Sequence, residues 1–124
     1  MYADTDFILA LIKDDDWLTG PAEKVYTQNK DVIWTSRYVL LETFMVAYRE
    51  GWDTREVLAN VEDLIEIRES VEEIFKASVK VEEDNMTPID AVNVVVSRDD
   101  KIISSDQKYD KNTDRLKLEE LREE

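Results

Sequence analysis

The sequence predicts an α/β fold in which a mostly parallel sheet of four or five strands is covered by helices. Two observations favour it. Short apolar segments alternate along the chain with longer segments of helical periodicity, a pattern typical of parallel sheets. The 124 residues contain 43% hydrophobic residues, enough for one core, and no repeat or linker divides them. Residues 1–124 are therefore expected to form a single domain.

Each predicted strand is a short run of apolar residues bounded by charged or turn-forming residues. In chain order they are Tyr2–Asp4, Val32–Thr35, Ser78–Val81, Lys101–Ser104 and a short fifth, Arg115–Leu118. The predicted helices have apolar residues three and four positions apart. They are Phe7–Lys13, Pro21–Lys30, Arg37–Glu50, a segment from Asp53 to about Lys76, and one that begins at Thr87.

Boundary residues support two of these helices. Ser36 is a good N-cap for the helix that starts at Arg37, because its hydroxyl can accept a hydrogen bond from a free backbone amide. Gly51 suits the end of the same helix, where a left-handed residue is common. Asp53 and Glu56 have the spacing of a capping box for the next helix.

The composition excludes several kinds of chemistry. The chain has no Cys and no His, so it cannot hold a thiol nucleophile, a cysteine zinc site or a Ser-His-Asp triad. Two glycines are too few for a glycine-rich phosphate loop. Any bound metal must have oxygen ligands, which favours Mg²⁺, Mn²⁺ or Ca²⁺.

The formal charge of −14 opposes non-specific binding of nucleic acid, which normally depends on basic surface. It is typical of adaptation to high salt, and an ordinary acidic protein is the alternative. No apolar run approaches the ~20 residues that span a bilayer, and the first residues lack the basic segment of a signal peptide. We therefore expect a cytoplasmic protein.

Four carboxylates adjoin apolar segments that should be buried: Asp4, Glu42, Asp90 and Asp106. Burying an ionised carboxylate is costly unless it is paired or binds a metal. Since ligands gather beyond the carboxyl ends of parallel strands, these acids can meet in one negative pocket. A divalent cation would neutralise that pocket, which indicates metal-dependent chemistry on a phosphate ester.

Each acid also has a purely structural interpretation. Asp4 and Asp90 can act as helix caps, the latter through Thr87 three residues earlier, and Asp106 can be a turn residue. Glu42 can pair with Arg37 or Arg49. The joint occurrence of the four acids, rather than any one of them, favours a shared site.

The chain resembles the PIN-domain nucleases, and among them the VapC-type toxins of toxin–antitoxin pairs. The resemblance extends over nearly the whole chain and depends on four motifs in order. They are Asp4-Thr5-Asp6, Thr35-Ser36 before a helix that bears Glu42, Pro88-Ile89-Asp90-Ala91, and Ile102-Ile103-Ser104-Ser105-Asp106 followed by Tyr109-Asp110. One departure is Asp6, which stands where the family often has Asn.

The resemblance implies a three-layer α/β/α sandwich and an Mg²⁺- or Mn²⁺-dependent ribonuclease. Asp4, Glu42, Asp90 and Asp106 match the acidic quartet of catalytic residues. The metal ligands would be Asp4, Asp90 and Asp106, with Asp110 as an accessory acid. Thr5 and Ser105 match small hydroxyl residues near the metal, and Arg37 is a candidate contact for a substrate phosphate.

The leading functional hypothesis is a metal-dependent endoribonuclease that acts as a toxin, is restrained by an antitoxin and forms a homodimer. Two alternatives remain. One is a non-catalytic PIN-fold interaction module, whose acids bind a structural cation or a basic partner. The other is a housekeeping RNA-processing nuclease with the same site and a different substrate.

Overall fold

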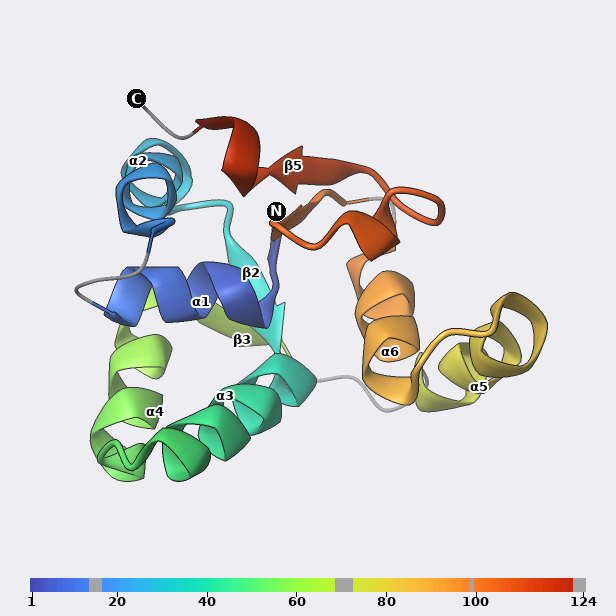
Figure 1. Cartoon of the computed structure of the whole chain (residues 1–124), viewed down its shortest axis with the longest axis horizontal. Helices are drawn as coiled ribbons and strands as arrows, with labels where there is room; N and C mark the ends of the chain where they lie inside the picture. Colours follow the sequence, from blue (N-terminus) through green and yellow to red (C-terminus); the bar gives the residue numbers. More distant parts are fainter. Residues whose placement is uncertain (14–16, 69–72, 99, 122–124) are drawn as a thin grey trace.

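A computed structural model describes residues 1–13, 17–68, 73–98 and 100–121 of the chain (Figure 1). Its strands form one five-stranded sheet in the order β3-β2-β1-β4-β5, and every neighbouring pair is parallel. The strands are β1 (Tyr2–Ala3), β2 (Trp34–Ser36), β3 (Glu66–Arg68), β4 (Ile102–Ser104) and β5 (Arg115–Lys117). The predicted α/β class is confirmed.

Helices cover both faces of this sheet. In Figure 1 the sheet is seen nearly edge-on, with α1, α2 and α4 on one side and α5 and α6 on the other. The helices are α1 (Thr5–Ile12), α2 (Thr19–Asn29), α3 (Arg37–Glu50), α4 (Thr54–Leu64), α5 (Glu73–Asp84) and α6 (Pro88–Ser97), with short 3₁₀ turns η1 (Gln107–Tyr109) and η2 (Leu118–Leu121). This is the predicted three-layer sandwich. Within the described ranges, no helix is both long and apolar enough to cross a membrane.

Cap residues confirm both predicted ends of α3 and the predicted start of α4. The Ser36 hydroxyl accepts a hydrogen bond from the Val39 amide at 3.3 Å, and Gly51 ends α3 in the left-handed region at φ 76°. The Asp53 carboxylate accepts from the Glu56 amide at 3.1 Å and so caps α4. These bonds satisfy backbone groups that have no partner inside the helix.

The third strand is a correction. Ser78–Val81, predicted as a strand, lies inside α5, and the helix predicted to continue to about Lys76 ends at Leu64. The third strand is instead β3, Glu66–Arg68, which pairs with the outer side of β2 and places Glu66 opposite Trp34. Two charged residues flank the single apolar residue of this edge strand, so it lacks the apolar run by which the other strands were predicted.

The middle of the sheet is the most deeply buried part of the molecule. Tyr2 and Ala3 of β1, and Ile102 and Ile103 of β4, are fully buried, as expected for parallel strands covered on both faces. The Tyr2 amide donates to the Lys101 carbonyl at 2.8 Å, which fixes β1 beside β4. The two strands therefore end side by side, at the same edge of the sheet.

Candidate active site

The carboxyl edge of the sheet gathers acidic residues from four parts of the chain. Asp4 directly follows β1, and Asp106 follows β4 by two residues. Glu42 lies in the second turn of α3, the helix that continues from β2, and Asp90 lies in the first turn of α6. Because β1 has β2 on one side and β4 on the other, chain connections leave it in opposite directions, which is where open α/β sheets bind ligands.

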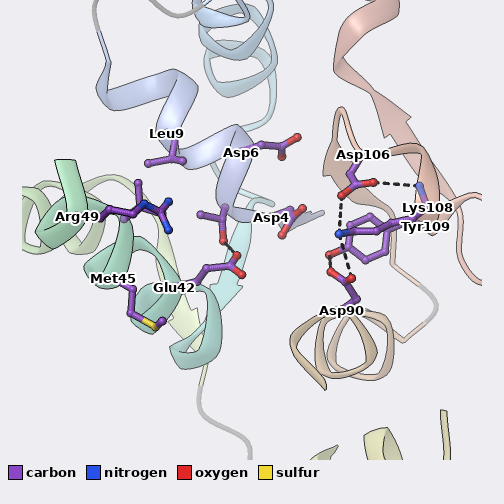
Figure 2. Close-up of a pocket in the computed structure, with 12 residues that line it drawn as sticks. Asp4, Asp6, Leu9, Glu42, Met45, Arg49, Asp90, Asp106, Lys108 and Tyr109 are labelled. Carbon is purple, nitrogen blue, oxygen red and sulfur yellow. Dashed lines mark hydrogen bonds and ion pairs between the residues drawn. The ribbon is translucent and has the colours of Figure 1, made fainter. Parts of the chain in front are cut away.

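These four acids line one pocket of about 390 Å³ (Figure 2). Asp6 lines it as well, so five carboxylates face two cationic side chains, those of Arg49 and Lys108. The remaining lining residues are Thr5, Leu9, Met45, Val46 and Tyr109. The pocket therefore carries an excess of negative charge that a bound cation would neutralise.

Asp4 is the most deeply buried acid of the pocket, with 7% of its surface exposed. Its carboxylate accepts hydrogen bonds from the Asn93 amide at 3.3 Å and the Ser104 hydroxyl at 3.1 Å. The pKa of Asp4 is raised to about 7, mainly by burial and secondly by repulsion from Asp6. Asp4 occupies the N-cap position of α1 without capping it through its side chain, so the capping interpretation is wrong.

Asp6 is held by the segment that follows β4. One of its oxygens accepts from the amide and the hydroxyl of Ser105, each at 2.6 Å, and lies 3.2 Å from the Ser104 hydroxyl. Its other oxygen, Oδ1, is buried and has no hydrogen-bond partner. Burial raises the pKa of Asp6, and the bonds from Ser105 oppose that rise. The Ser105 hydroxyl is thus directed to Asp6.

A buried polar network links Asp4 to Asp90. The Asn93 side chain accepts from the Tyr2 phenol at 2.8 Å and donates to both Asp4 and the Tyr109 hydroxyl, the latter at 3.1 Å. The Tyr109 hydroxyl in turn donates to Asp90 at 3.4 Å. Burial, and next the charge of Asp4, raise the pKa of Tyr109 above its usual value, so the phenol keeps its proton.

The Asp90 carboxylate also accepts a hydrogen bond from the Thr87 hydroxyl at 2.7 Å. The Thr87 side chain therefore bonds to Asp90 and does not cap α6. Asp106 accepts the Lys108 amide at 3.1 Å and so starts the η1 turn, as its structural interpretation predicted. The Lys108 ammonium lies between both acids. Partial burial opposes its charge, but the hydrogen bonds that the ammonium donates to Asp106 and Asp90 outweigh this and raise the pKa of Lys108 above its usual value.

Glu42 faces the pocket from α3, and the hydroxyl of Thr5 donates to its carboxylate (Figure 2). Its partner here is therefore a hydroxyl, where the structural interpretation expected an arginine. Arg49, one of those arginines, lines the same pocket two helical turns along α3. Thr5 is buried and belongs to the pocket, in keeping with its predicted place near the site.

Three predicted site residues are absent from the pocket lining, namely Ser105, whose hydroxyl is bonded to Asp6, Asp110 and Arg37. Asp110 forms an ion pair with Arg115, with Nε and Oδ1 2.7 Å apart, and is absent from the pocket lining. This interaction lowers the pKa of Asp110, since it favours the charged form. Arg37 is exposed at the first position of α3 and is also absent from the lining.

The residues of the pocket suit a hard divalent cation in three respects. Their donors are carboxylate and hydroxyl oxygens, one buried oxygen of Asp6 lacks a partner, and Asp4 and Asp6 repel each other. In the present positions of the described side chains, however, no three acids form a group that could hold one ion. Side chains would have to shift for three acids to hold one ion, and Lys108 separates two of these acids, Asp90 and Asp106.

The sequence interpretation assigned no role to Asn93, Ser104 or Tyr109, and it treated Lys108 only as a candidate contact for a substrate phosphate. A signal for Asn93 was present, because it is a lone amide in the apolar run Ala91–Val96 and lies one turn after Asp90. The other three adjoin Asp106, where a turn directs side chains in ways that the sequence does not specify. These residues position the acids through the hydrogen bonds described above.

Comparison with known proteins supports the fold. No protein-family model matches the sequence, and no curated protein matches it. The structure is similar to that of VapC20 from Mycobacterium tuberculosis, described as a toxin that cleaves the sarcin–ricin loop. The TM-score is 0.75 at 22% sequence identity, over 89% of this chain and 92% of VapC20. At this identity the similarity establishes the fold, which is the one that the resemblance implied.

Proposed function

We propose that this chain, which has the PIN fold of the VapC toxins, is a divalent-metal-dependent endoribonuclease and the toxin of a toxin–antitoxin pair. The observation that carries the proposal is the meeting of Asp4, Glu42, Asp90 and Asp106 around one pocket at the carboxyl edge of the sheet. The similarity to VapC20, a toxin that cleaves RNA, supports the same reaction class. We place the protein in the cytoplasm, where its RNA would be.

In this proposal Asp4, Asp90 and Asp106 hold Mg²⁺ or Mn²⁺, and Glu42 orients the reacting water. When bound, the ion polarises phosphoryl oxygens and lowers the pKa of water, which replaces the imidazole that this chain lacks. Ser104 and Asn93 orient Asp4 through their hydrogen bonds. Asp110 is left out of the metal site because Arg115 holds it elsewhere.

The RNA backbone must be held near an acidic pocket, so nearby cations matter. Arg49 lines the pocket and can offer a fork of donors to a phosphate. Arg37 begins α3 at the carboxyl end of β2, so we retain it as a second phosphate contact, farther from the reacting group. Thr5 and Ser105 act indirectly in this scheme, by positioning Glu42 and Asp6.

The central test is RNA cleavage by Asp4→Asn and Asp90→Asn, which remove one charge each and keep the side-chain size. We expect each to lower cleavage by about 100-fold or more, because a preorganised charge is lost at the reacting centre. Asp63→Asn is the matched control, since Asp63 is exposed on α4 outside the pocket. The assay covers a panel of RNAs, including a sarcin–ricin loop, with Mn²⁺ or chelator and at high salt.

One observation favours the non-catalytic alternative. Among the described residues no three acids are placed to hold one ion, and a lysine already neutralises two of them. A module of this kind would cleave no RNA with any metal and would form a stable complex with a basic partner. Undiminished cleavage by both Asp4→Asn and Asp90→Asn would instead reject the assignment of the site.

The proposed partners are an antitoxin and a second copy of the chain. Four large apolar side chains of α3 are 43–79% exposed and line a groove of about 520 Å³, namely Leu41, Phe44, Met45 and Tyr48. An exposed apolar surface of this kind is typical of a protein interface, so we propose that a second copy of the chain covers it. Light scattering, which gives the molar mass in solution, tests whether the chain forms a homodimer. Growth arrest on expression, relieved by the product of a neighbouring gene, separates a toxin from a housekeeping nuclease.

A further inference from the structure

Lys108 occupies the part of the pocket where two proposed metal ligands approach each other. Its ammonium nitrogen lies 3.0 Å from Asp90 Oδ2 and 2.9 Å from Asp106 Oδ2 (Figure 2). The two acids come from separate elements, since Asp90 is on α6 and Asp106 follows β4. A single side chain therefore forms ion pairs with two carboxylates that belong to different parts of the fold.

The two carboxylates differ in their need for a cation. The Asp90 side chain is 13% exposed, whereas that of Asp106 is 38% exposed and that of Lys108 is 51% exposed. A carboxylate as sheltered as Asp90 is costly without a compensating charge. The half-exposed lysine stem, in contrast, can move into solvent with little loss of packing.

The ammonium and a divalent ion cannot use these oxygens together. The Lys108 ammonium contacts Oδ2 of each acid, and Asp90 Oδ2 also accepts from the Thr87 hydroxyl. The other oxygens accept hydrogen bonds as well, Asp90 Oδ1 from the Tyr109 hydroxyl and Asp106 Oδ1 from the Lys108 amide. An ion bound to either Oδ2 would also lie within contact distance of the ammonium, where like charges repel strongly. One cation must leave for the other to bind.

We propose that Lys108 is a built-in counter-cation, which holds Asp90 and Asp106 in the metal-free protein and is exchanged for the divalent ion. The inference rests on the proposed function, since it takes these two acids as metal ligands. In the absence of metal the ammonium prevents the acids from repelling each other and keeps α6 beside the end of β4. On metal binding it leaves both carboxylates but stays near the pocket, because η1 fixes its backbone.

The exchange makes a quantitative prediction about metal affinity. Part of the binding free energy is used to break two ion pairs, so removing the ammonium should strengthen binding. Lys108→Gln should bind Mn²⁺ about five- to tenfold more tightly than wild type, given that ion pairs of this exposure contribute at most about 1 kcal/mol each. A lysine that merely lies near the site would have no such effect beyond that of the net charge.

Lys111→Gln is the matched control. Lys111 is exposed, lies three residues from Lys108 outside the pocket lining, and its loss changes the net charge equally. The full-length chain is titrated with Mn²⁺ alone at fixed ionic strength, and free Mn²⁺ is measured by electron paramagnetic resonance. We expect Lys111→Gln to stay within about twofold of wild type, as for a distant screened charge.

A second measurement uses wild-type protein, in case Lys108→Gln folds poorly without metal. The side-chain NMR signal of Lys108, assigned with Lys108→Arg, should shift on addition of diamagnetic Mg²⁺, while that of Lys111 should not. An unchanged or weaker Mn²⁺ affinity in Lys108→Gln, or a Lys108 signal that Mg²⁺ leaves in place, would overturn the exchange.

The two proposals fail in different ways. If wild type binds Mn²⁺ and cleaves RNA with it, yet Lys108→Gln shows wild-type affinity, the exchange is rejected and the nuclease assignment stands. If neither wild type nor Lys108→Gln binds Mn²⁺, and no RNA is cleaved, both are rejected. Tighter binding by Lys108→Gln alone supports the exchange whether or not the correct RNA is in the panel.

Discussion

Asp4 combines deep burial with a second carboxylate close by, although it is one of the proposed catalytic residues. It is almost inaccessible to water, and Asp6, two residues away, brings a second carboxylate to the same pocket. Hydrogen bonds from Asn93 and Ser104 keep the side chain oriented but do not supply a positive charge. This crowding lowers the stability of the fold, and a cation bound as proposed would relieve it.

This cost should appear in the pH dependence of stability. The pKa of Asp4 is raised from 3.8 to about 7, so the folded state binds its proton more tightly than the unfolded chain. The contribution of Asp4 is present below about pH 4 and is lost as the pH rises through about 7. In chelator, Asp4→Asn should match wild type near pH 4 and exceed it near pH 8 by on the order of 2–4 kcal/mol.

Urea unfolding of both proteins across this range measures the difference directly. The comparison with Asp4→Asn cancels the other titrating groups, such as Asp100 and Glu119, whose pKa values are lowered by their partners. A difference in unfolding free energy that stays constant from pH 4 to pH 8 would contradict the pKa assigned to Asp4.

At the scale of elements, α6 organises the site. Its first turn carries Asp90, and its next turn carries Asn93, which reaches Asp4 across the end of β1. Pro88 at the start of the helix leaves no amide to satisfy there, and the valines that follow bury the helix against the sheet. Because α6 is packed on the sheet, it fixes the positions of Asp90, which it carries, and of Asp4, which its Asn93 contacts.

Asn93→Ala tests this role. The substitution removes one buried hydrogen bond each from Tyr2, Tyr109 and Asp4, so it should lower the free energy of unfolding by about 1–3 kcal/mol. Asn60→Ala, on the exposed surface of α4, should change it by less than about 0.5 kcal/mol. Denaturant unfolding gives both values, and equal effects in the two variants would show that the network contributes little.

The same scale shows what the sequence could and could not predict. Strong patterns predicted β1, β2, β4 and α3, because apolar runs and cap residues report local structure. Ser78–Val81 was misread because Val79 and Val81 alternate with polar residues, while Ala77 and Val81, four residues apart, equally suit one helical face. In β3 the ladder to β2 stabilises a segment whose own composition favours no strand.

The acids of the pocket were predictable because a carboxylate beside an apolar segment needs an explanation. Their partners were not. Ser105 donates a hydrogen bond to Asp6, and Arg115 forms an ion pair that holds Asp110 away from the pocket. Lys108 forms ion pairs with two acids of the pocket. All three contacts depend on side-chain directions after β4, where turns rather than periodic elements decide the geometry.

For the whole molecule, the dominant property is its charge of −14, from 30 acidic and 16 basic residues. Like charges distributed over a small domain repel, and salt shortens the range of that repulsion from about 10 Å at 0.1 M to about 3 Å at 1 M. The negative charge of the protein also repels RNA. We therefore expect the rate of RNA cleavage to rise with salt, whereas salt weakens RNA binding by nucleases with basic surfaces.

Thermal stability should therefore rise with salt. Between 0.1 M and 2 M KCl at pH 7 we expect the Tm to increase by about 5 °C or more, as self-repulsion is screened. The control is the same pair of measurements at pH 4.4, the isoelectric point, where the net charge vanishes and the increase should largely disappear. An equal increase at both pH values would assign the effect to general salting-out.

The neighbouring positions of β1 and β4 have a consequence for synthesis of the protein. The strand beside β1 and Asp106 are translated about 100 residues after Asp4, which takes roughly 5–20 s at about 5–20 residues per second. A nascent chain still lacking β4 has no complete pocket, so the proposed activity cannot begin on a partly made polypeptide. A polypeptide released before β4 has been translated would lack the pocket in the same way.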